Sequence, residues 1–418
     1  MATENNNKTL NVPNKREQSQ TCLGYAERKE QSPQGNVPNL RFPEFSGEWA
    51  KTTLGKIGNT FNGLTGKSGA DFGQGSPYIT YKSIFDSSRI DLSRVEFVTI
   101  TDQERQKETQ NKVQFGDIFF TTSSETPEEV GMTSVLLDDI EDCYLNSFCF
   151  GYRLFAKDKT LPEYMRFYLR NQAIRKKLFV LAQGSTRFNI SKGEVMNVSV
   201  LLPETDEQKK IAKLLSLLEE RINTQIKIIE DLKKLKSAIR AKVFKQLESS
   251  CECWSEIGNM LQYEQPSKYL VASTEYSDSY ATPVLTANKA FILGYTDEEF
   301  GIYSKGECVI FDDFTMDVKF VNFPFKVKSS AIKILTANSG NDLYFVYEYL
   351  QNLGLVLEEH KRHYISEIEP MIVACPTFEE QQNISNLLRS FDSKIECANR
   401  ELTLYNKQKQ YLLSQMFI

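Results

Sequence analysis

The stretch LLPETDEQKKIAKLLSLLEERINTQIKIIEDLKKLKSAIRAKVF, residues 201–244, decides the fold because it occurs twice. Its second copy is ACPTFEEQQNISNLLRSFDSKIECANRELTLYNKQKQYLLSQMF, residues 374–417. The copies align without a gap, and the alignment pairs Pro203 with Pro376. Self-similarity at a fixed offset indicates two copies of one structural unit. We therefore expect the chain to run through one structural plan twice.

Both copies have the pattern of a long amphipathic helix. Apolar residues recur at spacings of three and four, which places them on one stripe of a helix. Each copy opens with a capping-box pattern, Thr205-x-x-Gln208 in the first and Thr377-x-x-Glu380 in the second. The stripe residues, predicted to form the core of a helix pair, are Ile211, Leu215, Leu218, Ile222, Ile229, Leu232, Ile384, Leu388, Phe391, Ile395, Leu402 and Tyr405.

The stripes fit either an internal helix pair or a homodimeric coiled coil. Two similar helices in one chain can pair with each other and still leave two similar outer faces. Such outer faces suit two copies of one partner, so we favour the internal pair.

Weaker sequence similarities occur in the segments that precede each helix. LGKIGN at 54–59 resembles WSEIGN at 254–259, and PEYMRFYLRN at 162–171 resembles LYFVYEYLQN at 343–352. Their offsets differ, which indicates two globular halves with the same order of elements and different loops. The expected organisation is a disordered polar arm at 1–38, a first globular domain at 39–202, a helix at 203–250, a second globular domain at 251–375 and a helix at 376–418.

The globular halves mix strand and helix signals. Short β-branched and aromatic runs predict strands, near 78–81, 113–120, 149–155, 309–311 and 332–335, and helical segments are expected at 164–169 and 344–353. The predicted fold class is therefore α+β, with one mixed sheet per half. Two globular domains would alternate with two long antiparallel helices in an internal pseudo-two-fold repeat.

Composition narrows the functional classes. The chain has 418 residues, a net charge of −5 and no apolar run long enough to cross a membrane. An acidic chain is not expected to coat DNA indiscriminately, although local basic patches can still contact it. The cysteines form no C-x-x-C pair, which argues against zinc; we expect reduced, mostly buried thiols and a cytoplasmic location.

Catalytic motifs are missing from the sequence. No N/D-P-P-Y/F tetrapeptide occurs, and the glycine-containing run 63–75 follows no apolar strand, so we interpret it as a loop rather than a cofactor cradle. Asp312, Asp313 and Asp317 lie in one short turn, which is more typical of a solvated acidic loop than of a metal-dependent nuclease. The sequence therefore predicts no catalytic and no metal site.

Small polar and basic residues gather at predicted loops instead. Arg and Lys can bind guanine or phosphate, and Asn can bind adenine. Any one of them can equally be an ordinary surface residue, but the clusters together favour DNA contact. The candidates are Thr80, Lys82, Thr121, Thr122, Ser123, Ser185, Thr186, Arg187, Asn189, Lys192, Thr286, Asn288, Lys289, Lys319, His360, Lys361 and Arg362.

These features together resemble the specificity subunit of type I restriction–modification enzymes. The resemblance runs from about residue 40 to the end, and rests on RFPEFSGEW (41–49), GDIFF (116–120), EQKKIAKLL (207–215) and EQQNISNLL (380–388). It implies that each globular half is a target recognition domain that reads one part of a split DNA site. It also implies that the helices keep the domains apart and bind two methyltransferase subunits, to which restriction subunits are added. S-adenosylmethionine would then belong to the methyltransferase, with no cofactor on this chain.

Two classes of function stay open at this point. One is a DNA reader that directs separate enzymes, and the other is an interaction scaffold whose globular halves bind protein. A self-sufficient enzyme is the weakest alternative, because the sequence has no catalytic motif.

Overall fold

The computed structural model describes residues 35–286, 291–355 and 364–418, so most of the predicted N-terminal arm lies outside them. Two compact units divide these residues. The first unit holds residues 35–224 and 402–418, and the second unit holds residues 225–401. The sequence-based boundaries follow the starts of the long helices, whereas the units divide within them, because each end of a helix packs on its own globular part.

The first unit contains a four-stranded antiparallel sheet of order β2-β9-β5-β7 and a three-stranded sheet of order β4-β3-β8, in which β3 and β8 are parallel. Two short pairs, β1-β11 and β10-β6, complete it. Its strands are β1 (Ala50–Thr53), β2 (Gly58–Asn62), β3 (Phe72–Ile79), β4 (Glu96–Val98), β5 (Ile118–Thr121), β6 (Ser123–Ser124), β7 (Thr133–Val135), β8 (Tyr144–Leu145), β9 (Cys149–Leu154), β10 (Phe188–Asn189) and β11 (Ser199–Leu202). Its helices before the long one are α1 (Leu54–Ile57), α2 (Tyr81–Asp86), α3 (Asp102–Lys107), α4 (Pro162–Tyr168), α5 (Gln172–Val180) and α6 (Lys192–Met196), with 3-10 turns at Gly69–Asp71, Leu92–Arg94, Thr109–Asn111 and Pro127–Glu129.

The second unit repeats this topology. Its sheets have the orders β13-β19-β16-β17 and β15-β14-β18, with β14 and β18 parallel, and its short pair is β12-β20. The strands are β12 (Trp254–Glu256), β13 (Leu261–Glu264), β14 (Thr282–Leu285), β15 (Ile292–Thr296), β16 (Cys308–Asp312), β17 (Val318–Val321), β18 (Lys326–Val327), β19 (Ile332–Ala337) and β20 (Ile372–Ala374). The helices are α8 (Ile257–Met260) and α9 (Leu343–Asn352), with a 3-10 turn at Pro266–Tyr269 and a π-helical turn at Tyr364–Ile368.

The matching sheet orders confirm the α+β fold and the internal repeat, but they correct two details of the sequence-based account. Each unit has separate sheets rather than one mixed sheet. The match of LGKIGN with WSEIGN is also displaced by three residues. Leu54 donates its amide to the Val198 carbonyl, and Ile257 makes the same bond to Met371, so Leu54 corresponds to Ile257 and not to Trp254.

Smaller elements also differ from their predictions. The 113–120 run becomes a strand only at Ile118, because Gly116 has a φ of 80° and turns the chain before it. Residues 72–75 of the predicted glycine loop belong to β3. Four of the seven described cysteines, Cys251, Cys253, Cys375 and Cys397, are exposed or half-buried, so the expectation of mostly buried thiols is wrong.

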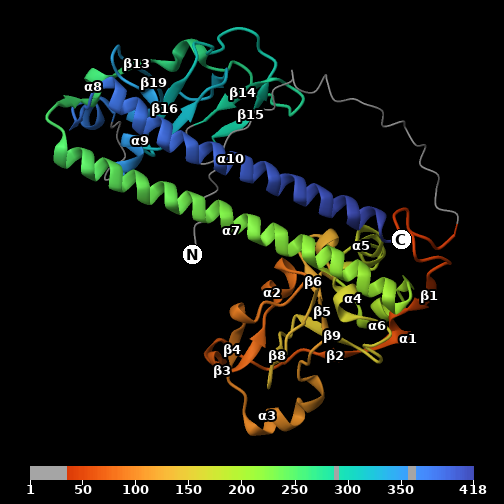
Figure 1. Ribbon diagram of the computed structural model, residues 1–418. Helices are drawn as coiled ribbons and strands as arrows, with labels where there is room; N and C mark the ends of the chain where they lie inside the picture. The colour runs from red at the N-terminus through yellow and green to blue at the C-terminus, as the bar shows by residue number, and fades with distance from the viewer. Residues whose placement is uncertain (1–34, 287–290, 356–363) are drawn as a thin grey trace. The chain divides into compact units, whose positions relative to one another are not determined.

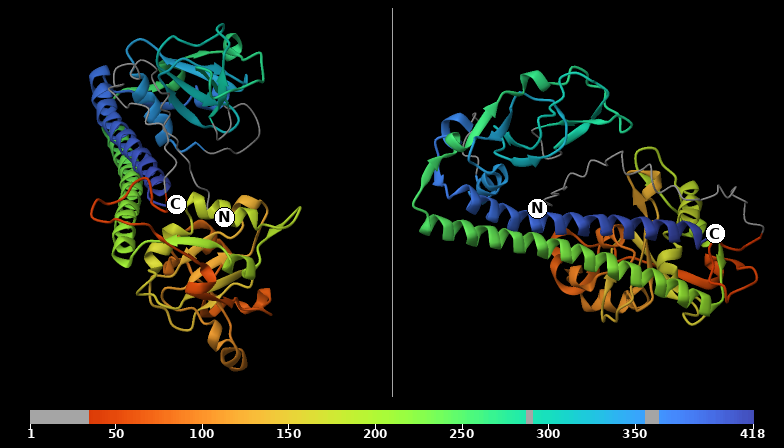
Figure 2. Two further views of the ribbon diagram at one scale, coloured as in Figure 1. Left: turned by 90° about the vertical axis from the view of Figure 1, so that its right-hand side faces the viewer. Right: turned by 45° about the horizontal axis from the view of Figure 1, so that its top comes forward.

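The long helices are α7 (Thr205–Ser250) and α10 (Phe378–Gln415). In each unit they run side by side in opposite directions (Figures 1 and 2). In the first unit Lys409 Nζ lies 2.6 Å from Glu219 Oε1, and in the second Lys236 Nζ lies 2.6 Å from Asp392 Oδ1. The repeat alignment pairs Lys236 with Lys409 and Glu219 with Asp392, so the same ion pair forms once in each unit with the two helices exchanging roles.

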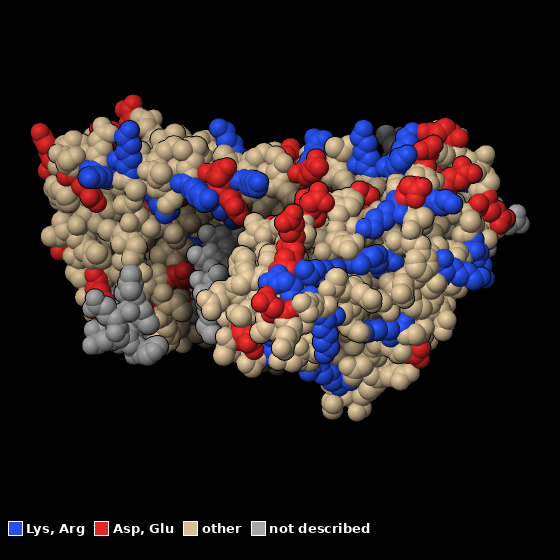
Figure 3. All heavy atoms as spheres, turned by 90° about the horizontal axis from the view of Figure 1, so that it is seen from below, with Lys and Arg blue, Asp and Glu red and all other residues tan. Residues whose placement is uncertain are grey.

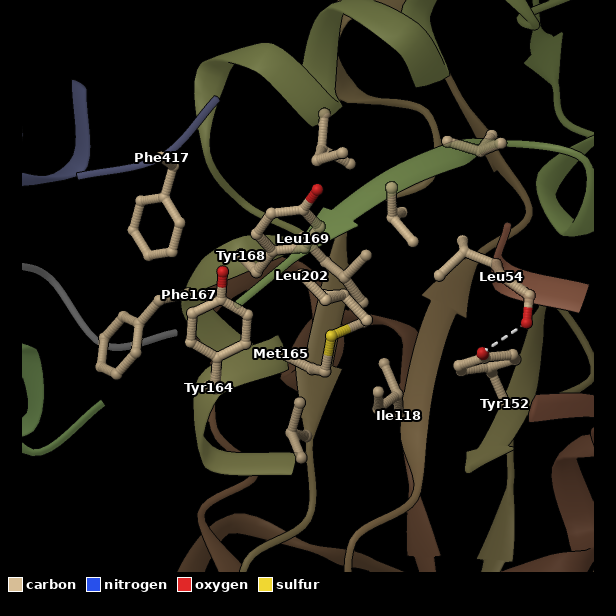
Figure 4. Packing of buried hydrophobic residues seen from close by; sticks show 14 of the residues in the cluster. Leu54, Ile118, Tyr152, Tyr164, Met165, Phe167, Tyr168, Leu169, Leu202 and Phe417 are labelled. Carbon is tan, nitrogen blue, oxygen red and sulfur yellow. Dashed lines mark hydrogen bonds between the residues drawn. The ribbon is translucent and has the colours of Figure 1, made fainter. Parts of the chain in front are cut away.

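The predicted helix stripe faces the interior of each unit. Its fully or largely buried members are Ile211, Leu215, Leu218, Ile222, Ile229, Leu388, Phe391 and Ile395, and its half-buried members are Leu232, Ile384, Leu402 and Tyr405. The end of the chain also packs inward. Phe417 lies against Tyr164 and Tyr168 of α4, with ring centroids 5.7 and 5.9 Å apart (Figure 4).

The second capping box forms as predicted, with the Thr377 amide donating to Glu380 and the Glu380 amide donating to the Thr377 hydroxyl. The first does not form. Thr205 is the first residue of α7 and its hydroxyl donates to the Lys159 carbonyl, while the Gln208 side chain bonds to Leu161. Among the described residues, none of the helices is long and apolar enough to serve as a membrane span.

Candidate DNA interface

The candidate residues of the first unit come together around the short pair β6-β10. Ser123 and Ser124 of β6 pair with Asn189 and Phe188 of β10. This pairing brings the 121–124 and 185–192 segments, which are distant in sequence, to one place. The Tyr81 hydroxyl donates to the Ser123 carbonyl over 2.7 Å, which adds the start of α2 to the same site.

An exposed loop forms the outer edge of this site. Ser185, Thr186, Arg187 and Asn189 are all exposed. The Arg187 guanidinium lies 5.9 Å from the ring centre of Phe148, which is itself 57% exposed. An arginine beside an exposed aromatic ring can contact both the bases and the phosphates of a nucleic acid.

The adjoining basic residues have local partners. Lys192 Nζ contacts the Asn62 side-chain oxygen and lies 5.9 Å from the Phe150 ring centre. Burial lowers the pKa of Lys192 below its usual value. Lys82 is exposed and pairs with Asp86 one turn later on α2 over 2.8 Å, a pairing that water and salt weaken.

Three candidates are buried and therefore are not surface contacts. Thr121 is fully buried, and its hydroxyl accepts a hydrogen bond from the Met132 amide at 2.9 Å. Ser123 and Thr286 are buried as well. Thr80 is half-buried and caps α2 by accepting from the Ser83 amide, and Thr122 is also half-buried. The Thr121 hydroxyl is occupied by a backbone amide of its own unit, which the residue type alone does not reveal.

The second unit offers fewer described candidates. Lys319 is half-buried and lies 3.7 Å from Asp317. Asn288, Lys289, His360, Lys361 and Arg362 lie outside the described residues.

The acidic turn of this unit is only partly the solvated loop that the sequence predicted, because Asp317 alone of its three aspartates is exposed. Asp312 and Asp313 are both buried. Asp313 lies 3.2 Å from the buried Lys333 and accepts from the Tyr364 amide, while Asp312 accepts from the Thr315 hydroxyl. These contacts use the carboxylates to hold the turn against the sheet.

Surface charge is mixed. On the face drawn in Figure 3, Lys and Arg alternate with Asp and Glu among the described residues.

The first unit also has a cleft of about 1010 Å³ between the α2–β4 segment, α4 and the two long helices. In it, Glu219 of α7 pairs with both Arg166 of α4 and Lys409 of α10. Burial lowers the pKa of Arg166 to about 10. Arg166 and Lys409 are therefore occupied by Glu219, and their ion pairs join α4 and α10 to α7 within the unit.

A buried glutamine ties each globular part to its long helix. Gln208 Oε1 accepts from the Leu161 amide at 2.9 Å, just before α4, and Gln208 Nε2 donates to the Pro203 carbonyl at 2.9 Å. In the second unit Gln381 Oε1 accepts from the Asp342 amide at 2.8 Å, just before α9, and Gln381 Nε2 donates to the Pro376 carbonyl at 3.0 Å.

Sequence reasoning assigned Gln208 to a capping box and gave Gln381 no role of its own. The signal was present, because both stand at the same place in the repeat and a glutamine that lies among apolar residues must find partners for both ends of its amide. A tyrosine makes a parallel contact in each unit. Tyr168 accepts from the Leu201 amide, and Tyr349 accepts from the Ala374 amide. Gln208 and Gln381 therefore set the position at which each long helix joins its globular part.

The comparisons with known proteins agree with this arrangement. Residues 46–234 match the family described as type I restriction modification DNA specificity domain. The specificity subunit of the Escherichia coli type I restriction enzyme EcoR124I/EcoR124II is 42% identical over 176 residues, which cover 39% of this chain. The match spans 44% of that relative, less than half of its length.

Longer matches cover nearly the whole chain. A protein assigned as the MjaX type I restriction enzyme specificity subunit of Methanocaldococcus jannaschii is 24% identical over 418 aligned positions, covering 91% of this chain and 95% of the relative. The crystal structure of a type I restriction–modification S subunit from M. genitalium matches with a TM-score of 0.59 and 15% identity, over 91% of this chain and 99% of that one, which shows a shared fold. Together these matches show that the chain is similar to type I restriction–modification specificity subunits over most of its length, and that residues 46–234 match the DNA specificity domain of that family.

Proposed function

We propose that this chain is a non-catalytic subunit that reads a bipartite, asymmetric DNA site and directs separate enzymes to it. Its partners are double-stranded DNA, two methyltransferase subunits and restriction subunits. The methyltransferase holds S-adenosylmethionine and transfers the methyl group, and this chain supplies the choice of site.

The single observation that carries the proposal is that the globular part is repeated, and each of these two globular parts is called a head. Each unit has the same two sheet orders, and in each a buried glutamine, Gln208 or Gln381, anchors the globular part to a long helix. Two heads built alike can each present the same edge to DNA. Their loops differ in length and sequence, so the two half-sites that they read should differ.

In the first head, the segments around the β6-β10 pair supply the edge that would contact DNA. Arg187 and Asn189 lie in and beside β10, and a hydrogen bond from the Thr122 amide to the Phe148 carbonyl holds the exposed Phe148 ring near them. Guanidinium and amide groups are the side chains best suited to the base edges of the major groove. Nearby lysines such as Lys192 are suited to phosphate contact.

The helices supply a surface for protein partners. In the first unit, Leu217 of α7 and Leu404 and Tyr411 of α10 are each about half exposed or more. Exposed apolar side chains on a helix are available for contact with another protein. We assign this surface to the methyltransferase subunits.

A domain exchange tests the two-headed proposal. Residues 50–200 would be replaced by the matching domain of a related specificity subunit, and the complex with its methyltransferase would be expressed. We expect methylation mapping across a genome to show one changed half-site and one retained half-site. A change in both halves, or a single continuous palindrome, would contradict two independent heads.

Salt dependence separates this proposal from a protein-binding scaffold. The complex should bind the mapped DNA site with an affinity that falls steeply as salt rises, because phosphate contacts release counterions. The same DNA with both half-sites scrambled is the matched control. Equal affinity for both DNAs would favour the scaffold.

A further inference from the structure

Three cysteines of the second unit lie together where its globular part joins both long helices. Cys251 and Cys253 follow the end of α7 at Ser250, and Cys375 lies between β20 and α10. The Cys253 carbonyl oxygen accepts from the Cys251 thiol at 3.0 Å and from the Cys375 amide at 2.9 Å. The cluster therefore spans the two points at which the chain enters and leaves this globular part.

Cys253 and Cys375 are opposed across an antiparallel ladder. β12 and β20 pair Trp254 with Ala374, and the bond between Cys375 and Cys253 extends that ladder by one residue. The first unit has the corresponding opposed pair, Ala50 with Leu202, in β1 and β11. Opposed residues place their side chains on one face. In hydrogen-bonded pairs their Cα atoms lie about 5.5 Å apart, within the range of about 4.4–6.8 Å that a disulfide spans.

The thiols differ in access. Cys253 is exposed, whereas Cys375 and Cys251 are half-buried and pack against the core of the unit. Burial, together with the neighbouring thiols of Cys251 and Cys253, raises the pKa of Cys375 above its usual value. The exposed Cys253 is therefore placed to react first with a solute, and Cys375 to react second from within the structure.

We propose that Cys253 and Cys375 form a reversible intramolecular disulfide that ties the end of α7 to the start of α10. The oxidant is a small-molecule disulfide. The Cys253 thiolate attacks it, the oxidant's sulfur–sulfur bond breaks, and one small thiol leaves and takes up a proton. The Cys375 thiolate then attacks the mixed disulfide and releases the second small thiol. Two protein thiols are oxidised, and one small disulfide is reduced to two thiols.

The exposure of Cys253 makes this bond reducible. Exposed disulfides are open to attack by small thiols and are among the labile ones. The site thus fits a switch rather than a permanent cross-link, and it acts on the junctions rather than on DNA contacts.

The test uses the full chain in its native state. The protein is incubated with oxidised glutathione, blocked with an alkylating agent and mapped by peptide mass spectrometry. We expect a Cys253–Cys375 cross-linked peptide that dithiothreitol removes. Cys397, an exposed thiol of the same unit on α10, is the internal control and should carry only glutathione. The cross-link should form faster at pH 9 than at pH 7, because more of the Cys375 thiol is then ionised.

Two substitutions sharpen the test. Cys253→Ser should abolish the cross-link and leave Cys375 without glutathione, since the second step needs the first. Cys397→Ser should leave the cross-link unchanged. A Cys251–Cys375 bond would overturn the proposal. So would glutathione on Cys253 without an internal bond, or a cross-link that forms only in denaturant.

Discussion

Gln208 and Gln381 show how one residue type can orient a whole domain. Each is almost completely buried, and each uses both ends of its amide to hold a helix N-terminus of the globular part against the turn before a long helix. A glutamine at the first turn of a helix is ordinary in sequence terms. Its role depends on the partners that the fold brings to it.

Replacing either glutamine should therefore weaken its own unit. Gln208→Ala leaves the Leu161 amide without its acceptor, and an unsatisfied buried group costs about 1–3 kcal/mol in the free energy of unfolding. Gln381→Ala should have a similar effect through the Asp342 amide. Chemical denaturation would measure both, with Gln382→Ala as the control because Gln382 is exposed. Equal stabilities for the Gln381 and Gln382 variants would contradict the anchoring role.

Arg187 is the residue on which the first reading head can be tested most directly. Arg187→Ala should leave the fold intact, because the side chain is exposed and its described contact is the Phe148 ring. We expect the affinity of the complex for its DNA site to fall by about 1–3 kcal/mol, with relaxed specificity in one half-site.

The comparison variant is Arg94→Ala. Arg94 is also exposed in the first unit, but it pairs with Asp91 and belongs to neither strand of the β6-β10 pair. DNA binding that falls equally in both variants would assign Arg187 to general surface charge, and unchanged binding would remove it from the interface.

At the scale of elements, the paired helices are the most strongly specified part of the chain. Leu215 and Leu218 lie in the buried stripe of α7, whereas Leu217 between them is 53% exposed. The same ion pair forms once in each unit, as Glu219–Lys409 in the first and Lys236–Asp392 in the second. The two helices are therefore aligned in the same register in both units.

Charge in the buried stripe should break this pairing. Leu215→Asp with Leu218→Asp should destabilise the first unit by about 4 kcal/mol or more, because apolar contacts are lost and carboxylates are buried without partners. Leu388→Asp with Phe391→Asp should do the same to the second unit. Leu217→Asp is the matched control for thermal unfolding and should have little effect. Double variants that unfold like the wild type and still support methylation would show that the stripe is not a structural core.

At the scale of the whole molecule, the chain should depend on partners for chemistry. The sequence has no base-holding tetrapeptide and no cofactor loop. The purified chain, mixed with DNA and S-adenosylmethionine, should therefore transfer no methyl group, and addition of the methyltransferase subunit should restore transfer. Radiolabelled methyl incorporation measures both. Transfer by the isolated chain, free of contaminating methyltransferase, would show that a catalytic site exists in it.

The sequence by itself determined the two-part plan, the long helices and the α+β class. These follow from signals that are local or repeated in one register: the spacing of apolar residues, the absence of Gly and Pro within the helices, and the gapless match of 201–244 with 374–417. A helix stripe depends only on residues three and four apart, so it can be recognised without knowing what it packs against.

The tertiary structure decided which polar residues are exposed and can bind a partner, and which are buried and stabilise the fold. Thr121 and Asp313 were grouped with surface residues by type, but both are buried, and their partners Met132 and Lys333 come from other segments of the fold. The opposed pair of Cys253 and Cys375, far apart in the sequence, likewise exists only through the β12-β20 ladder. Strand pairing joins residues at long sequence separation, and no local pattern encodes which residue will stand opposite another.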